Sequence, residues 1–338
     1  MTAVFTVVGV THIQQETFQG LEELVGLVRN ADLTGVQLRP GVPGGRFLCA
    51  SADGVEFTAV HYEGDVRTRG VYTSRVSLGV RTFQRGQVTQ WGETALPGDV
   101  FVMPGGGEHE DLVAGQVSYA VLSFDVSALV ELGCGEAWEG DRGIWERPHK
   151  YRAPAHVRDG ICRSIRQFTH LLAGHMGAMS ERRLESFQKD LAETFLSGIV
   201  FATDEPEAPG KYRSARLVRA VEDWVAAMAP EPVRIADVCR QLGVSRRSLE
   251  RAFHETLNMG PAQYLITKRL SEAHLALATA DPRAVSVTDV AIDHGFWELG
   301  RFAARYVQMF GEKPSETLHR SMNTRLDSQE DLGLANCA

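Results

Sequence analysis

Membrane spans and disulfide frameworks are the first features that this sequence of 338 residues lacks. No apolar run approaches the roughly 18 residues that a membrane-spanning helix needs. The opening stretch MTAVFTVVGVTHIQQETF has no basic region before its apolar residues, so we expect no signal peptide. The five cysteines are odd in number, scattered and never in a C-x-x-C pair, which argues against a disulfide framework and a structural zinc site. These absences predict a protein of the reducing cytoplasm.

Negative charge dominates the chain as a whole but is spread unevenly. The formal net charge is −8, which by itself disfavours a nucleic-acid partner. Residues 1–210 carry a net charge of −9, whereas residues 211–322 hold 16 lysines and arginines against 13 aspartates and glutamates, a net charge of +3. This asymmetry indicates a mildly basic module attached to an acidic one.

The order of the periodic patterns predicts an α+β multidomain protein. Residues 32–125 are rich in β-branched and aromatic residues, with turn residues at intervals of roughly 8–12, which is typical of a sandwich or barrel. We expect a helix at about 16–30 before this region, and helices again from about 155 to 202. One apolar stripe in the later helices fits a dimer helix and a helix packed on the barrel equally well. It consists of Leu184, Phe187, Leu191, Phe195 and Ile199.

Two prolines and a glycine in DEPEAPGK, residues 204–211, mark the best linker in the chain. The predicted organisation places a β-rich, cupin-like domain before this linker and an all-α domain of two helix-turn-helix units after it. The boundaries are 1–150 for the β-rich domain, 151–204 for a helical segment, 205–211 for the linker, 212–322 for the all-α domain and 323–338 for a disordered tail.

The segment after the linker contains a repeat. The first copy has Asp237-Val238, Gly243-Val244, Leu249, Phe253, Leu257, Pro261 and Leu265, and the second has Asp289-Val290, Gly295-Phe296, Phe302, Tyr306, Phe310, Pro314 and Leu318. The offset is 52 residues through Val244 and Phe296 and 53 from Leu249 and Phe302 on, so the second turn contains one inserted residue. A duplicated supersecondary unit is the economical explanation, with copies at 235–256 and 287–309.

Each copy is predicted to be a helix, a tight turn and a second helix. In the first copy, Gly243 provides the left-handed residue of the turn and Ser245 is a good N-cap for the second helix. Leu249 and Phe253 then point inward, while a polar face made of Arg246, Arg247, Glu250, Arg251 and His254 points outward. Such a helix suits the DNA major groove, because arginine binds guanine and carboxylates accept hydrogen bonds from cytosine. A plain solvated surface is the alternative, and the glycine turn, the cap and the duplication together favour DNA.

A connecting helix is predicted over 260–280, with its packing residues at Tyr264, Leu265, Leu270, Ala273 and Leu277. About 20 residues span about 30 Å, close to the ~34 Å between successive major grooves on one face of DNA. The two units could therefore enter adjacent grooves of one site.

The two copies and the helix between them resemble the AraC/XylS family of bacterial transcription regulators over roughly 212–320. The resemblance lies in VSRRSLERAFHETLNMGPAQYLITKRLSEA and VTDVAIDHGFWELGRFAARYVQMFGEKPSETL. It implies promoter DNA as a partner, RNA polymerase as a second partner, and no cofactor. It places the base-reading positions of the first unit at Arg246, Arg247, Glu250 and Arg251, and those of the second at Glu298, Leu299, Gly300 and Arg301.

The second unit departs from the family pattern. Where an arginine usually follows the apolar anchor by two residues, Ala304 stands instead, with Arg305 shifted by one. Leu299 and Gly300 have no side-chain group that could hydrogen-bond a base. We therefore expect the second unit to bind mostly through phosphates and DNA shape. At the end of the first reading helix, Asn258 replaces the usual glycine, which is a mild change because asparagine tolerates the left-handed conformation.

The segment LPGDVFVMPGGGEH, residues 96–109, resembles the second motif of cupin barrels. A metal cupin also needs an earlier H-x-H with a downstream glutamate, and residues 61–95 offer only His61 and Glu63. With His109 as the one well-placed ligand, we expect no metal site. A cupin-type metalloenzyme with an accessory DNA-binding domain is accordingly the weaker alternative.

The β-rich domain is expected to respond to a small-molecule effector, with control by a protein partner as the alternative. A purely architectural DNA-binding protein would not need about 200 residues of acidic, β-rich chain. Six aromatic residues fit a pocket lining but are individually better explained as core. They are Phe57, Tyr62, Tyr72, Phe83, Trp91 and Phe101. The overall prediction is a regulator that is not an enzyme and that could form a homodimer.

Overall fold

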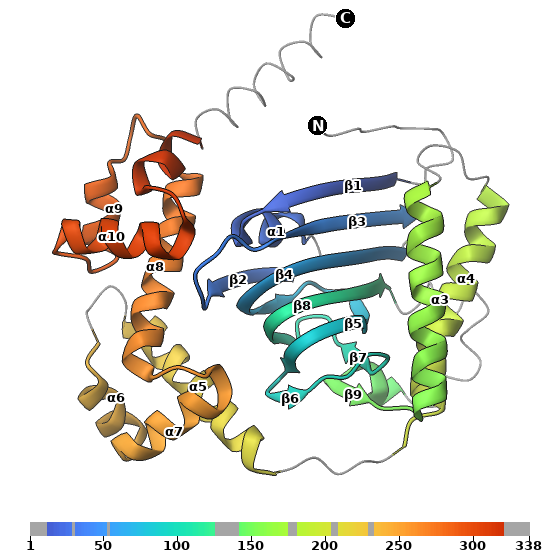
Figure 1. The fold of residues 1–338 in the computed structure, drawn as a ribbon. Helices are drawn as coiled ribbons and strands as arrows, with labels where there is room; N and C mark the ends of the chain where they lie inside the picture. The colour runs from blue at the N-terminus through green and yellow to red at the C-terminus, as the bar shows by residue number, and fades with distance from the viewer. Residues whose placement is uncertain are drawn as a thin grey trace, which may run out of the picture. The chain divides into compact units, whose positions relative to one another are not determined.

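The computed structural model describes residues 12–28, 31–52, 55–125, 142–174, 181–203, 209–228 and 233–320. The chain divides into two compact units, the first formed by residues 1–35 and 43–207 and the second by residues 36–42 and 208–338 (Figure 1). The first is built around an antiparallel sheet and the second around helices, as the predicted α+β fold class requires. The predicted tail 323–338 and residues 204–208 of the predicted linker lie outside the described residues.

The first unit contains a nine-stranded sheet with the order β1-β3-β4-β8-β5-β7-β9, to which β2 adds beside β4 and β6 beside β5. The strands are β1 (His12–Gln19), β2 (Ala31–Gln37), β3 (Gly44–Ala52), β4 (Val55–Tyr72), β5 (Val76–Gln90), β6 (Glu93–Thr94), β7 (Val100–Met103), β8 (Glu108–Phe124) and β9 (His149–Tyr151). Three of them are far longer than the turn spacing predicts, because β4, β8 and β5 run side by side for 15 to 18 residues.

Glycines allow these long strands to bend. Gly64 and Gly86 both pair with Gly115, so three glycines lie side by side across the middle of the sheet. A side chain at Gly86 would place its Cβ 2.0 Å from the carbonyl oxygen of Ala114, and one at Gly115 would place it 2.2 Å from that of Arg85. Glycine inside a strand marks a bend or close approach of another backbone. The three glycines therefore interrupt the β-branched residues of these strands at the line where the sheet bends.

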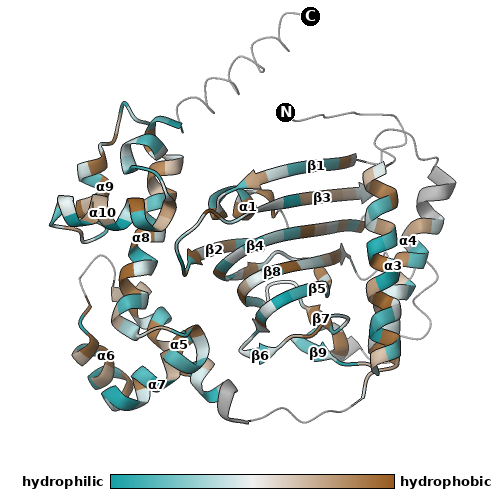
Figure 2. Cartoon of the chain, in the orientation of Figure 1, coloured by the Kyte–Doolittle hydropathy of each residue, from teal (hydrophilic) through white to brown (hydrophobic). Residues whose placement is uncertain are grey.

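Helices cover one face of the curled sheet, and the other face encloses a second core. Helices α3 (Ala155–Gly174) and α4 (Glu181–Val200) share a buried cluster with Leu78 and Leu122 of the sheet. Figure 2 shows hydrophobic and hydrophilic residues alternating along α3, as an amphipathic helix requires. On the opposite face, the short helix α1 (Leu21–Leu27) packs in a cluster with Phe18 and Phe101. A 3₁₀ turn, η1 (Arg142–Trp145), completes the described elements of this unit.

Two local predictions for the first unit are wrong. The helix expected at 16–30 is only α1, because Phe18 lies in β1, where it is buried, and Gly20 separates strand from helix with a φ of 122°. Phe83 was expected in a core or pocket but is 40% exposed. The register between β5 and β8 shifts between Arg81 and Phe83, and this bulge buries Arg81 and Thr82 while it turns Phe83 outward.

The stripe on α4 packs inside the first unit. Leu191, Phe195 and Ile199 are buried in the cluster beneath α3, and the ring of Phe187 lies 4.8 Å from that of Phe168, centroid to centroid. The side chain of Leu184 lies outside the described residues. Of the two explanations that the sequence left open, packing on the sheet is the one observed for these residues.

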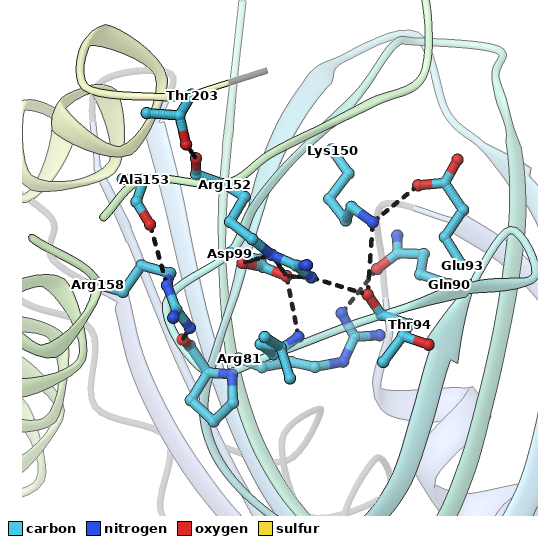
Figure 3. Close-up of polar contacts among 12 residues, drawn as sticks. Arg81, Gln90, Glu93, Thr94, Asp99, Lys150, Arg152, Ala153, Arg158 and Thr203 are labelled. Atoms are coloured by element: carbon cyan, nitrogen blue, oxygen red, sulfur yellow. Dashed lines mark hydrogen bonds and ion pairs between the residues drawn. The ribbon is translucent and has the colours of Figure 1, made fainter. Parts of the chain in front are cut away.

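A buried ion pair explains the acidic residue of the segment LPGDVFVMPGGGEH. The carboxylate of Asp99 is fully buried and accepts hydrogen bonds from Arg152 Nε at 3.0 Å and Nη2 at 2.6 Å, and from the backbone N–H of Leu96 at 3.0 Å (Figure 3). Arg152 Nη2 also donates to the carbonyl oxygen of Thr94. Gly98 allows α3 to approach, since a Cβ there would lie 2.4 Å from the Cβ of Arg158. The motif therefore fastens the chain between β9 and α3 to the sheet.

From residue 209 on, the described part of the second unit consists of helices joined by turns and contains no strand. Its labelled helices are α5 (Pro209–Met228), α6 (Ile235–Leu242), α7 (Arg246–Leu257), α8 (Pro261–Thr279), α9 (Val287–Asp293) and α10 (Leu299–Phe310), and residues 314–320 are also helical. Because α5 begins at Pro209, residues 209–211 of the predicted linker are helical, with proline at the first helical position, where it is well tolerated.

Candidate nucleic-acid interface

The first helix-turn-helix unit consists of α6 and α7, joined by a tight turn. Gly243 ends α6 in the left-handed conformation, with φ 62°, and its backbone N–H bonds the carbonyl oxygen of Cys239. Ser245 caps α7, since its Oγ accepts a hydrogen bond from the backbone N–H of Ser248 at 3.1 Å. Leu249 and Phe253 are fully buried below the helix. The predicted turn and cap are confirmed.

The outward face of α7 carries arginine side chains that few contacts restrain. Arg246, Arg247, Arg251 and His254 are exposed, and Glu250 is partly buried. The ion pairs on this face are loose, with Arg246 Nε 3.8 Å from Glu250 Oε1 and Arg251 Nε 3.9 Å from Glu255 Oε1. Within the described part of the chain, Arg247 forms no hydrogen bond or ion pair. Its guanidinium donors are therefore available to a ligand.

The second unit, α9 and α10, has the same construction with a stronger entry cap. Ser286 and Asp289 form a capping box at the start of α9, and the hydrogen bonds from Ser286 lower the pKa of the Asp289 carboxyl. Gly295 again occupies the left-handed region, with φ 76°. Phe296 and Phe302 are buried with ring centroids 5.0 Å apart, so they take the places of Val244 and Leu249 of the first unit.

The outward end of α10 differs in chemistry from that of α7. Glu298 and Arg301 pair with each other at 3.0 Å, and Arg305 is exposed farther along the helix. Between them, Leu299 and Gly300 are exposed and carry no polar side-chain atom. Sequence reasoning missed Trp297, which is 72% exposed and directly precedes Glu298, the N-cap of α10. Its signal was the one-residue insertion in the second turn.

Helix α8 connects the two helix-turn-helix units and packs against both. Its predicted packing residues are all buried, namely Tyr264, Leu265, Leu270, Ala273 and Leu277. Toward the first unit, the ring of Tyr264 lies 5.5 Å from that of Phe253, centroid to centroid. Toward the second, His274 Nδ1 lies 2.6 Å from the hydroxyl of Tyr306, which in turn donates to Thr317. One helix therefore contributes to the cores of both units and connects them.

A separate cavity of about 80 Å³ lies within the first unit, between the curled sheet and α1. Leu24 and Val25 of α1 and Val28 at its C-cap form apolar lining, and Tyr62, Tyr72 and Tyr119 line it from the sheet. By the same measure of volume, a single water molecule needs roughly 10–15 Å³. The cavity therefore has room for several waters or for one small organic molecule.

The two charged side chains that line this cavity, Arg81 and Asp111, form an ion pair. Arg81 Nη2 lies 2.6 Å from Asp111 Oδ1, and Arg81 Nη1 donates to Gln90 at 2.9 Å. Burial lowers the pKa of His109, so its imidazole is neutral at pH 7. Burial also raises the pKa of Tyr62, Tyr72 and Tyr119, so their hydroxyls stay protonated. Sequence reasoning missed Arg81 and Asp111, whose signal was charge within segments predicted to be strands.

The residues considered for a metal site do not come together. His109 lies between Tyr72, whose hydroxyl is 2.6 Å from Nδ1, and Thr68, whose hydroxyl is 2.9 Å from Nε2. His61 lines a different cavity beneath α3 and is 2.8 Å from the hydroxyl of Ser118. Among the described residues, no three metal-binding side chains form a cluster. Of the aromatic residues considered for a pocket, Tyr62 and Tyr72 line the cavity, while Phe57 and Phe101 are buried in the two cores.

Comparison with known proteins identifies the helical unit. A family model described as "Helix-turn-helix domain" matches residues 238–320. The "Probable thc operon regulatory protein" of Rhodococcus erythropolis is 36% identical over 138 residues, which are 38% of this chain and 40% of the relative. The "XylDLEGF operon transcriptional activator 2" of Pseudomonas putida is 37% identical over 115 residues, 34% of this chain and 71% of the relative. A solved structure of a probable AraC family transcriptional regulator from Rhodopseudomonas palustris CGA009 is 39% identical, covering 31% of this chain and 97% of that one, with a TM-score of 0.28. The chain belongs to the AraC/XylS family.

The family model matches residues 238–320, which lie in the helical unit. The matches to relatives span 40% of the length of the Rhodococcus relative and 34% of "XylDLEGF operon transcriptional activator 3" of Pseudomonas putida. The AraC/XylS assignment makes α6–α7 and α9–α10 the two helix-turn-helix units of the family. No helix among the described residues combines the length and the hydropathy needed to cross a bilayer.

Proposed function

We propose that this protein is a sequence-specific DNA-binding transcriptional regulator whose two helix-turn-helix units bind one promoter site. The observation that carries the proposal is the pair of outward polar faces on α7 and α10, joined by a helix that packs into both cores. The 19 residues of α8 correspond to about 28 Å. That length is near the ~34 Å between major grooves on one face of DNA.

In the first unit, the arginines of α7 are proposed to read bases. A guanidinium can donate two hydrogen bonds to O6 and N7 of guanine, and a carboxylate such as that of Glu250 can accept one from cytosine. Arg247 and Arg251 lie on the exposed face, and Ser245 and His254 lie at the two ends of the same helix. The polar groups at the ends are suited to phosphate contacts, which position the helix.

In the second unit, fewer bases are proposed to be read through hydrogen bonds. Arg301 and Arg305 can contact phosphates, while Glu298 is already paired with Arg301. Leu299 and Gly300 supply no donor or acceptor from their side chains. Binding by this unit is therefore proposed to depend more on phosphates and on the shape of the DNA.

Selection of binding sites from random duplexes by the full chain tests the DNA assignment. Arg247→Ala should weaken binding to the selected site by about 1–3 kcal/mol and relax base preference in one half of it. Arg85→Ala is the matched control, because it removes the same charge from an exposed position on β5. Failure to select any consensus, or an equal loss for Arg247→Ala on selected and random duplexes, would contradict base reading by α7.

We further propose that an uncharged small molecule bound in the cavity of the first unit controls DNA binding. Arg81 and Asp111 neutralise each other, and the tyrosines and His109 are uncharged, so a charged ligand would enter without a counter-ion. The hydroxyls of Tyr62 and Tyr119 make no hydrogen bond within the described residues and border the cavity. A ligand with an apolar body and one hydroxyl or carbonyl group fits this lining.

Thermal shift of the full chain with matched probes tests the ligand class. Benzyl alcohol should stabilise the first unit more than benzoate does at equal concentration, because a ligand stabilises the state that it binds. Tyr119→Phe should reduce the effect of benzyl alcohol, whereas Tyr151→Phe, outside the cavity, should not. Stabilisation by benzoate alone would show that the cavity accepts an anion.

We also propose that this regulator contacts RNA polymerase and that it forms a homodimer. A dimer would have to use residues other than Leu191, Phe195 and Ile199, which are buried within the first unit. Val200 and Phe201, at the end of α4, are exposed and apolar.

A further inference from the structure

An exposed tryptophan stands at the entrance to the second reading helix. In the first unit, Val244 is followed directly by Ser245, the N-cap of α7. In the second unit, Trp297 is inserted between Phe296 and Glu298, the N-cap of α10. Trp297 is therefore the residue that lengthens the second turn, and it has no counterpart in the first copy. Its side chain is 72% exposed.

Trp297 is not needed for the core of its unit. Phe296, the residue before it, is buried and packs against Phe302, whose ring in turn lies 5.5 Å from that of Tyr306, centroid to centroid. Large exposed apolar side chains in a soluble domain are informative when they adjoin one another. Here Leu299, the first residue of α10, is 40% exposed two positions after Trp297.

The surroundings leave space for a ligand to come close. Gly300 follows Leu299, and a Cβ placed on it would have no atom within 4 Å. The charged neighbours Glu298 and Arg301 are paired with each other at 3.0 Å. At the start of α10, Trp297 and Leu299 thus expose apolar atoms beside one ion pair, whereas the start of α7 carries Arg246 and Arg247.

Base edges in the major groove offer one apolar group, the C5-methyl of thymine. We propose that Trp297, together with Leu299, recognises thymine through this methyl group in the part of the DNA site bound by the second unit. The inference rests on the proposed function. It adds a preference for thymine that the hydrogen-bonding groups of α10 alone do not predict. The second unit would then select bases, although Leu299 and Gly300 lack donors and acceptors.

Replacement of thymine by uracil isolates the methyl group, because the two bases differ in nothing else. The full chain is tested on its selected duplex and on duplexes with uracil at each thymine under α10. Loss of the decisive methyl should weaken binding by the wild type about fourfold, the factor that corresponds to burial of one such group. Trp297→Ala should weaken binding to the thymine duplex by at least that factor and show no further loss with uracil.

Two controls keep the test specific. Val307→Ala removes another exposed apolar side chain from α10, two turns beyond its start, and should leave the uracil effect intact. Uracil under α7 should affect wild type and Trp297→Ala equally. An unchanged uracil penalty in Trp297→Ala would overturn the inference, as would normal DNA binding by that variant with reduced transcription, which would point to a protein contact. Both results keep specific binding and so leave the proposed function standing, whereas absence of any selected site would remove the proposed function itself.

Discussion

Replacement of Asp99 should destabilise the first unit more than loss of any surface ion pair. Asp99→Ala removes an acceptor that is fully buried and that bonds Arg152 at two nitrogens and the backbone N–H of Leu96. Breaking a buried ion pair by removing one partner typically costs about 3–5 kcal/mol. The side chain of Arg152 is 18% exposed and keeps its bond to the carbonyl oxygen of Thr94, so water and that carbonyl partly satisfy it. We therefore expect a loss somewhat below this range, about 2–3 kcal/mol.

Thermal unfolding of the full chain, followed through the transition of the first unit, measures this loss. For a unit of this size, about 1 kcal/mol lowers Tm by about 2–4 °C, so Asp99→Ala should lower it by about 4–12 °C. Glu93→Ala is the matched control from the same region (Figure 3), since it removes a more exposed partner, paired with Lys150 at 3.1 Å. Lys150 keeps its hydrogen bond to the carbonyl oxygen of Thr94 in this variant, so the loss should be smaller than that of Asp99→Ala. Equal shifts for the two variants would refute the assignment of Asp99 as the fastening residue.

The remaining predictions concern a titrating group and two helix ends. Burial lowers the pKa of His109, and the charge of Arg81 lowers it further while that of Asp111 raises it. The folded state therefore favours neutral His109. This contribution to stability is fully present above about pH 6.5 and is lost as the pH falls below that value. The Tm of the first unit should therefore fall less between pH 7.5 and 5.5 in His109→Gln than in wild type, and an equal fall would contradict the burial argument. Asn258 ends α7 with φ 52°, so Asn258→Ala should destabilise the second unit by about 1 kcal/mol, while Asn258→Gly should not. Ser245→Ala should cost about 0.5–2 kcal/mol through loss of the cap, measured on the same transition, and no loss would mean that water replaces the cap.

The helical unit was largely predictable from the sequence because its signals are local. A glycine with positive φ, a serine N-cap and apolar residues at helical spacing depend on their immediate neighbours, and Gly243, Ser245 and Leu249 meet each requirement as predicted. The duplication doubled this information, because the same set of buried positions had to fit both copies. The sequence also predicted that the region 32–125 forms a sheet.

The shape of the sheet was not predictable in the same way, because it depends on pairing between distant strands. Gly64, Gly86 and Gly115 look like three separate turn signals along the chain, yet they pair across one line and bend strands that continue through them. The predicted spacing of short strands was wrong for this reason. The bulge that turns Phe83 outward likewise depends on its partner strand β8.

The residues of the candidate DNA-binding site were likewise predictable only in part. A repeat identifies the residues that both copies must bury, since a change there would cost packing energy in either copy. Outward residues carry no such constraint, so a comparison of the two copies reveals them only where the copies differ. Arg247 and Leu299 differ in chemistry at equivalent ends of α7 and α10, and Trp297 differs by having no equivalent at all. In a duplicated DNA-binding unit, shared residues therefore report the fold, and the unshared exposed ones are where base preference has to be sought.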